Sequence, residues 1–161
     1  MHLYRHLFYQ KPARFRANSG HCHCSGGSLN QEVFSYIYRK FDGVTRNIQL
    51  ILNRLYETEK HVDSNKKADA VISHIVYRNS MQYEELIGFL TDNQFAVVKA
   101  IAKEGTVESP QSNSFIKRNN LPSASSIKTA LSVLLDKDIV SHSPSGYSVY
   151  DRFFEMWLKR L

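Results

Sequence analysis

Apolar residues recur three and four positions apart over most of the chain, which is the spacing of one buried helix face. Two helices are expected first, over about 28–41 and 45–57, and a longer connector helix over about 65–89. Ser28 followed by Gln31 has the pattern of a capping box, which predicts where the first helix begins. The expected buried positions include Val33, Phe34, Ile37, Tyr38, Phe41, Ile48, Ile51, Leu52, Leu55, Ala68, Val71, Ile72, Ile75, Val76, Tyr83, Leu86 and Ile87.

A second group of elements begins near Leu90, where Thr91 and Gln94 form another capping box. Three helices and a hairpin are expected, and this order is that of a winged helix, in which the hairpin is the wing. The expected elements are a helix over 91–103, a short helix capped by Ser109 with Pro110 at its first position, a helix over 123–136 capped by Ser123, and a hairpin that turns at 143–146. A final helix over about 151–161 is rich in aromatic residues, which we expect to seal this domain against the connector helix.

The formal charge of +6 lies mainly at the start of the chain. Residues 1–30 carry four basic residues and no acid, so 6 − 4 leaves +2 for the rest. Residues 1–27 are also polar and glycine-rich without a sustained period, and we expect a poorly ordered basic tail there. The expected organisation is therefore this tail, a helical segment with its connector over 28–89, and a winged-helix domain over 90–161. The fold class is mainly α with a small β-hairpin.

The two cysteines, Cys22 and Cys24, lie in the run HCHC. No second Cys/His cluster follows at a spacing typical of structural zinc sites, so we expect no metal and no cofactor. No apolar run approaches the roughly 18 residues that a membrane-spanning helix requires. The first 20 residues have no continuous apolar stretch of the signal-peptide kind either. These patterns predict a cytoplasmic protein without a membrane partner.

The helix over 123–136 occupies the position of the DNA-reading helix in a winged helix. If its apolar residues face inward, then Ser125, Lys128, Thr129 and Ser132 face outward, where they would be available to phosphates or bases. Lys117, Arg118 and His142 complete the candidate nucleic-acid contacts. Affinity for the phosphate backbone grows with the number of cations, so this sparse set predicts a packing element whose DNA binding, if any, is weak and electrostatic.

Four segments carry a resemblance that spans about residues 29–161: FSYIYRKFDGVTRNIQLILNRLYE, LTDNQFAVVKAIAKEG, SPQSNSFIKRNNLPSASSIKTALSVLLDKDIV and YSVYDRFFEMWLKR. They resemble the C-terminal region of AAA-type P-loop ATPases often called the archaeal ATPase family. The resemblance implies that the first segment is a remnant of the helical lid and that the other three form a winged helix. In GVTRNIQ, Arg46 is similar in placement to the sensor-two arginine of AAA proteins, which implies a nucleotide-sensing origin for this residue.

The nucleotide-binding half of such an ATPase is absent from this sequence. None of the seven glycines belongs to a GxxxxGK[ST] loop, and no apolar run ends in paired acids that would hold magnesium. We therefore expect a non-enzyme, arising from a truncated or frameshifted gene or as a fragment. Its expected partner is a protein or the missing ATPase core.

Three functions remain open from the sequence: a non-catalytic ATPase remnant whose winged helix is an interaction or regulatory module, a winged-helix DNA-binding protein, and an enzyme. The enzyme is disfavoured because His61, His74 and His142 are scattered, without a nucleophile or carboxylate at a spacing that would suggest shared chemistry.

Overall fold

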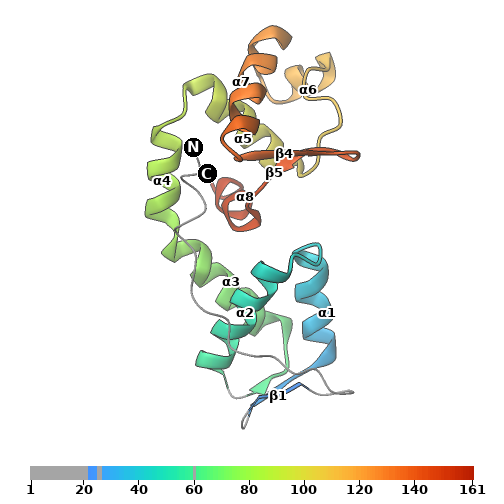
Figure 1. The fold of residues 1–161 in the computed structure, drawn as a ribbon, viewed down its shortest axis with the longest axis vertical. Coiled ribbons are helices and arrows are strands. Elements are labelled where there is room, and N and C mark those ends of the chain that lie inside the picture. Colours follow the sequence, from blue (N-terminus) through green and yellow to red (C-terminus); the bar gives the residue numbers. More distant parts are fainter. Residues whose placement is uncertain (1–21, 25–26, 60) are drawn as a thin grey trace. The chain divides into compact units, whose positions relative to one another are not determined.

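The structure is a computed structural model that describes residues 22–24, 27–59 and 61–161. Its contacts divide the chain into two compact units, Met1–Ile75 and Val76–Leu161. Each unit has its own buried apolar core. The elements of both are shown in Figure 1.

The first unit combines short strands with helices. In chain order its elements are β1 (Cys22–Cys24), β2 (Gly27–Leu29), α1 (Gln31–Lys40), α2 (Thr45–Thr58), β3 (His61–Val62) and most of α3 (Asn65–Arg78). The strands form a sheet of order β1-β2-β3, antiparallel between β1 and β2 and parallel between β2 and β3. The buried side chains of this unit include Val33, Ile37, Phe41, Ile48, Ile51, Leu52, Leu55 and Ile72. The helical periodicity predicted these positions.

The start of α1 differs from the prediction. Ser28 does not cap the helix, because it belongs to β2, where its Oγ lies 3.0 Å from His61 Nδ1 across the β2–β3 pair. The cap is Asn30, whose side-chain oxygen accepts a hydrogen bond of 2.8 Å from the Glu32 N–H. The predicted stop is confirmed, since Gly43 adopts a positive φ of 71°, a conformation that glycine tolerates without strain.

The second unit is a winged helix, as the order of its elements predicted. Its elements are α4 (Ser80–Gly88), α5 (Asp92–Glu104), α6 (Asn113–Arg118), α7 (Ala124–Asp136), β4 (Val140–Ser143), β5 (Gly146–Val149) and α8 (Arg152–Leu158). The predicted capping box of α5 is present, with Thr91 and Gln94 bonding each other's backbone N–H groups. The hairpin turns between Ser143 and Gly146, as expected.

One extended residue, Val107, widens the wing beyond the hairpin. It exchanges two backbone hydrogen bonds of 2.9 Å with Tyr147 of β5. The sequence did not reveal this pairing, because a single residue has no alternating pattern. The wing is therefore held to the segment that follows α5 as well as to its own partner strand.

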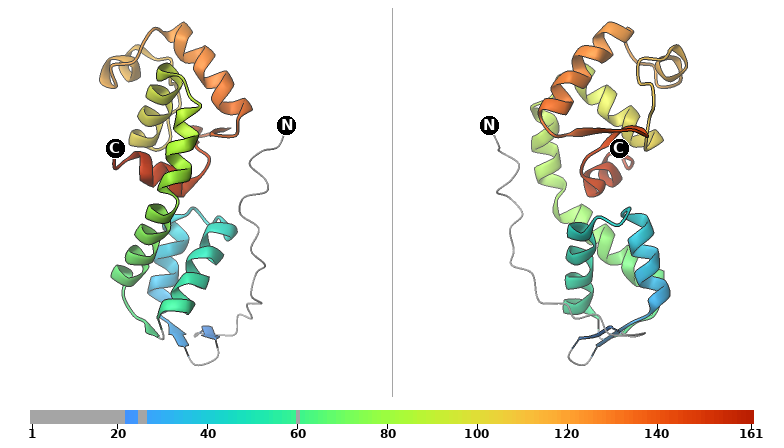
Figure 2. Two further views of the ribbon diagram at one scale, coloured as in Figure 1. Left: turned by 90° about the vertical axis from the view of Figure 1, so that its left-hand side faces the viewer. Right: turned by 45° about the vertical axis from the view of Figure 1, so that its right-hand side comes forward.

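Aromatic residues of α8 pack against α4, which confirms the expected seal. The ring centroid of Tyr83 lies 5.1 Å from that of Phe154 and 5.6 Å from that of Trp157. Figure 2 shows α4 running beside α8. Glu155 on α8 is also buried, and it accepts hydrogen bonds from Arg152 and Lys159, so its charge is compensated within the helix.

Two helix boundaries in the second half of the chain differ from the prediction. The expected connector helix over 65–89 is divided at Asn79, where φ is −90° and ψ is 0°. The Ser80 hydroxyl donates to the Tyr77 carbonyl at this break, a local bond that competes with the helix. The short helix α6 is capped by Ser112 and not by Ser109, because Pro110 lies in a turn closed by the Ser112 N–H and the Ser109 carbonyl.

The predicted poorly ordered tail over 1–27 lies mostly outside the described residues. Within that range the structure describes strand β1 and the first residue of β2. The side chains of the HCHC run are not among those described, so the prediction about metal at Cys22 and Cys24 stays a prediction.

Candidate functional site

The outward face of α7 is fixed by what the helix buries. Ser123 caps the helix by accepting from the Ser126 N–H, and the following turns bury one side of it. The buried residues are Ile127, Ala130, Leu131 and Leu134. The residues predicted to face outward are all exposed: Ser125, Lys128, Thr129 and Ser132. They are spaced by three and four and therefore share one face.

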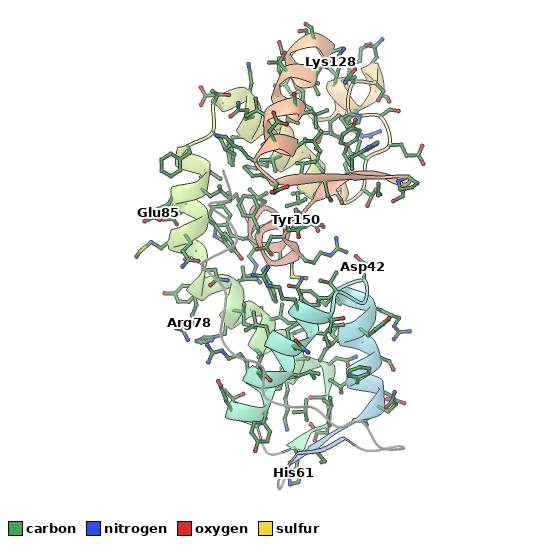
Figure 3. All side chains as sticks on the ribbon, viewed as in Figure 1. Asp42, His61, Arg78, Glu85, Lys128 and Tyr150 are labelled. Atoms are coloured by element: carbon green, nitrogen blue, oxygen red, sulfur yellow. The ribbon has the colours of Figure 1, made fainter. Side chains whose placement is uncertain are left out.

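The hydroxyls of this face make local contacts. Ser125 Oγ lies 2.9 Å from Ser123 Oγ, and Thr129 Oγ1 donates to the Ser125 carbonyl over 3.2 Å. Lys128 is the one charged residue among these four, and Figure 3 labels it in the first half of α7. The face therefore offers one cation among polar but uncharged groups.

Next to this face lie two basic residues, Lys117 and Arg118, and an ion pair with Glu104 offsets the charge of Arg118. The sequence did not predict this ion pair. Arg118 donates from Nε and Nη2 to the two carboxylate oxygens of Glu104, over 2.9 and 2.8 Å. The Asn119 amide also donates to Glu104 over 2.7 Å. The hydrogen bond from Arg118, followed by that from Asn119, holds the pKa of Glu104 below its ordinary value. Much of the Arg118 charge is thus offset, and Lys117, which is exposed, is the remaining cation of α6.

The wing contains an aromatic pair, His142 and Tyr147. The His142 ring lies over Tyr147 with centroids 4.3 Å apart, so the candidate contact residue is positioned by its neighbour on β5. Residues 139–150 contain no Lys, Arg, Asp or Glu. A DNA-binding wing of this sequence would have to act through hydroxyls and rings alone.

The net charge of the surrounding domain also disfavours binding to a phosphate backbone. Residues 81–160 contain nine Lys and Arg and nine Asp and Glu, and 9 − 9 gives no net charge. Electrostatic attraction to a phosphate backbone depends on an excess of cations on the binding face. The domain has no such excess, and its α7 face has a single cation.

Other candidate residues lie elsewhere in the chain. Arg46 occupies the first turn of α2 in the first unit and is exposed. His61 bonds Ser28 in the small sheet, and His74 is exposed on α3. Within the described residues no group of three His, Cys, Asp or Glu side chains is arranged to hold a metal ion. No helix of the described chain has the length and apolar character needed to cross a membrane.

Comparison with known families agrees with this architecture. Residues 81–160 match the model of a family described as a probable winged helix domain. The match begins within α4 and extends through α8, so it includes the Tyr83 packing described above. This part of the chain is a winged-helix domain, a class of module that binds DNA or protein. No curated protein and no solved structure gives a significant match.

Proposed function

We propose that this chain is a non-catalytic protein whose winged helix acts as a protein-interaction or regulatory module. The observation that carries the proposal is the α7 face, where a single cation stands among hydroxyls on a domain without net charge. The electrostatic part of DNA affinity grows with the number of phosphates that cations neutralise, and the α7 face has too few cations for tight binding. The cores of protein interfaces, in contrast, are depleted of charged residues, so a weakly charged face suits a protein partner.

The proposal extends to the origin of the chain, as the C-terminal portion of an AAA-type ATPase. Its support is the resemblance over residues 29–161, with a helical segment before a winged helix in the order that the resemblance implies. Arg46 at the start of α2 would then descend from a nucleotide-sensing residue. The partner of the module would be an ATPase core or another protein.

DNA-binding protein is the second candidate function. Lys117 and Lys128 favour it, because both are exposed on the helices that a winged helix presents to DNA. A module of this kind with few free cations would bind duplexes weakly and with little sequence preference.

Fluorescence anisotropy with labelled duplexes across a salt series separates the two functions. The protein-module proposal expects dissociation constants no tighter than about 10⁻⁶ M near physiological salt, the range of non-specific binding. Nanomolar, sequence-selective binding that collapses on changing Ser125, Lys128 or Thr129 would establish the DNA-binding function instead.

Calorimetry with Mg·ATP tests the non-catalytic part of the proposal. We expect no binding heat at micromolar protein and no turnover above background, since the sequence has no phosphate-binding loop. Micromolar binding accompanied by hydrolysis would show that the chain is an enzyme.

A further inference from the structure

The outer face of α4 and of the residues just before it is unusually apolar for a surface. Tyr77, Met81 and Phe89 expose 75%, 70% and 78% of their surface. Tyr83 lies on the other side of α4, buried against α8, so the helix has one packed face and one open face. Scattered single apolar residues are common on surfaces, but three within one short segment mark a candidate contact area.

Three charged residues are exposed on this segment, Arg78, Glu84 and Glu85, and two of them, Arg78 and Glu85, flank its middle. Arg78 and Glu85 are exposed, and neither takes part in an ion pair among the described residues. Figure 3 shows both on the outer side of this helical segment. Arg78 is the last residue of α3 and Glu85 lies on α4, beyond the break at Asn79, and no ion pair joins the two.

We infer that this face binds a second copy of the chain, with α4 and the end of α3 before it antiparallel to the same segment of the second copy, about a two-fold axis near Met81 and Gln82. Arg78 and Glu85 lie three to four residues on either side of that axis. In an antiparallel pair, Arg78 therefore meets Glu85 of the second copy, and the same contact occurs twice. Arg78 and Glu85 are thus self-complementary in this arrangement, whereas Glu84 is an additional acid that the pairing leaves unmatched.

Two of the three exposed apolar residues, Met81 and Tyr77, fit the same arrangement, whereas Phe89 lies at the end of α4, away from the axis. Met81 lies next to the axis, where it would pack against its own copy, and its flexible side chain adapts to a symmetric contact. Tyr77 lies beside Arg78, at the outer part of the same contact. A single helix face is smaller than the roughly 800 Å² per partner of a standard interface, so the dimer is weak and favoured by low salt.

Sedimentation equilibrium of the full chain at low ionic strength tests this inference. We expect self-association with a dissociation constant on the order of 10⁻⁴ M or tighter. Arg78→Glu alone and Glu85→Arg alone should each weaken it at least about tenfold, because each places like charges opposite one another. The double variant Arg78→Glu/Glu85→Arg should restore self-association, and an equimolar mixture of the two single variants should form a heterodimer.

Two further variants separate the interface from general effects of charge and folding. Met81→Ala should weaken the dimer while circular dichroism and the unfolding midpoint stay unchanged, since the side chain is mostly exposed in the single chain. Lys103→Glu on α5 changes a surface charge away from this face and should leave self-association unchanged.

A chain that stays monomeric at about 1 mM would overturn the inference. The face would then be covered by another segment of the chain or by a different protein. Failure of the double charge swap to restore association would overturn it equally, because self-complementarity is its basis.

Discussion

Gly146 lies at a position of the wing that leaves no room for a side chain. Its φ is +123°, and a Cβ placed on it would lie 2.6 Å from the Val107 carbonyl oxygen, which belongs to the backbone pair that anchors the wing. Replacing Gly146 with alanine should therefore lower the free energy of unfolding by about 1–3 kcal/mol or more, through backbone strain and displacement of Val107. Urea denaturation followed by circular dichroism measures the change.

Gly88→Ala is the matched control for that substitution. Gly88 ends α4 without a positive φ, and a Cβ there meets nothing within 4 Å. Its replacement should leave stability unchanged or raise it by up to about 1 kcal/mol. Equal stability of Gly146→Ala and wild type would show that the wing accommodates a side chain at this point.

At the scale of the element, α7 has buried apolar residues that pack in the core and an exposed cation, Lys128, that does not. Leu134 is fully buried between α7 and the rest of the winged helix, so Leu134→Ala should cost about 2–5 kcal/mol through lost apolar contact and the cavity left behind. Lys128→Ala should change stability by less than about 0.5 kcal/mol, because its side chain is exposed. Thermal and urea unfolding of both variants check this contrast. A large loss from Lys128→Ala would mean that its charge supports the fold.

The contact between α5 and α6 predicts a pH dependence. Arg118 lowers the pKa of Glu104, so the folded state holds its proton less tightly than the unfolded chain. The stabilisation by this pair is therefore present above the ordinary value of 4.5 and is lost as pH falls through the lower folded value. Carboxyl-detected NMR titration should place Glu104 below 4.5.

Arg118→Gln should raise the pKa of Glu104 back toward its ordinary value, although Asn119 would retain part of the shift. Lys117→Gln is the control, because no described contact joins Lys117 to this carboxylate, and it should leave the titration in place. An unchanged Glu104 titration in Arg118→Gln would contradict the assigned cause.

The elements that the sequence predicted well are those with a strong local signal. The buried stripe of α7 and the capping box of α5 depend on spacing within one helix, and both are present. The misplaced cap at Ser28 and the missed pairing of Val107 have another origin, because each depends on a partner far along the chain. A short polar residue can cap a helix or pair in a sheet equally well, and only the tertiary contact decides.

The candidate site shows the same division. Exposure of the Ser125, Lys128 and Thr129 side chains follows from helical period alone, so the sequence placed them on the outward face. The pairing of Arg118 with Glu104 joins residues fourteen positions apart on different helices, and no local sequence pattern predicts it. Charge counted along the sequence therefore overstated the cations that this surface offers.

At the scale of the whole molecule, the position at which the winged helix begins has a measurable consequence. The sequence placed the start near Leu90, just before the capping box of Thr91 and Gln94, whereas contacts group the chain from Val76 onward and the family match begins at residue 81. The difference is α4, whose Tyr83 covers Phe154 and Trp157 of α8. Whether α4 belongs to the folding unit therefore depends on how much these aromatic contacts contribute.

Two fragments, 76–161 and 90–161, test that contribution. The longer fragment keeps the Tyr83 contacts and should unfold cooperatively, since it is one compact unit with many buried apolar residues. The shorter fragment exposes the α4-facing side of Phe154 and Trp157 and should lose about 2–4 kcal/mol, the cost expected for removing a buried aromatic cluster partner. Urea unfolding followed by Trp157 fluorescence reports directly on the contact. In the full-length chain, Tyr83→Ala should reproduce most of this loss, whereas Met81→Ala on the open face should not. Equal stability of the two fragments would place the start of the domain at Leu90, and α4 would then be an appendage of the winged helix.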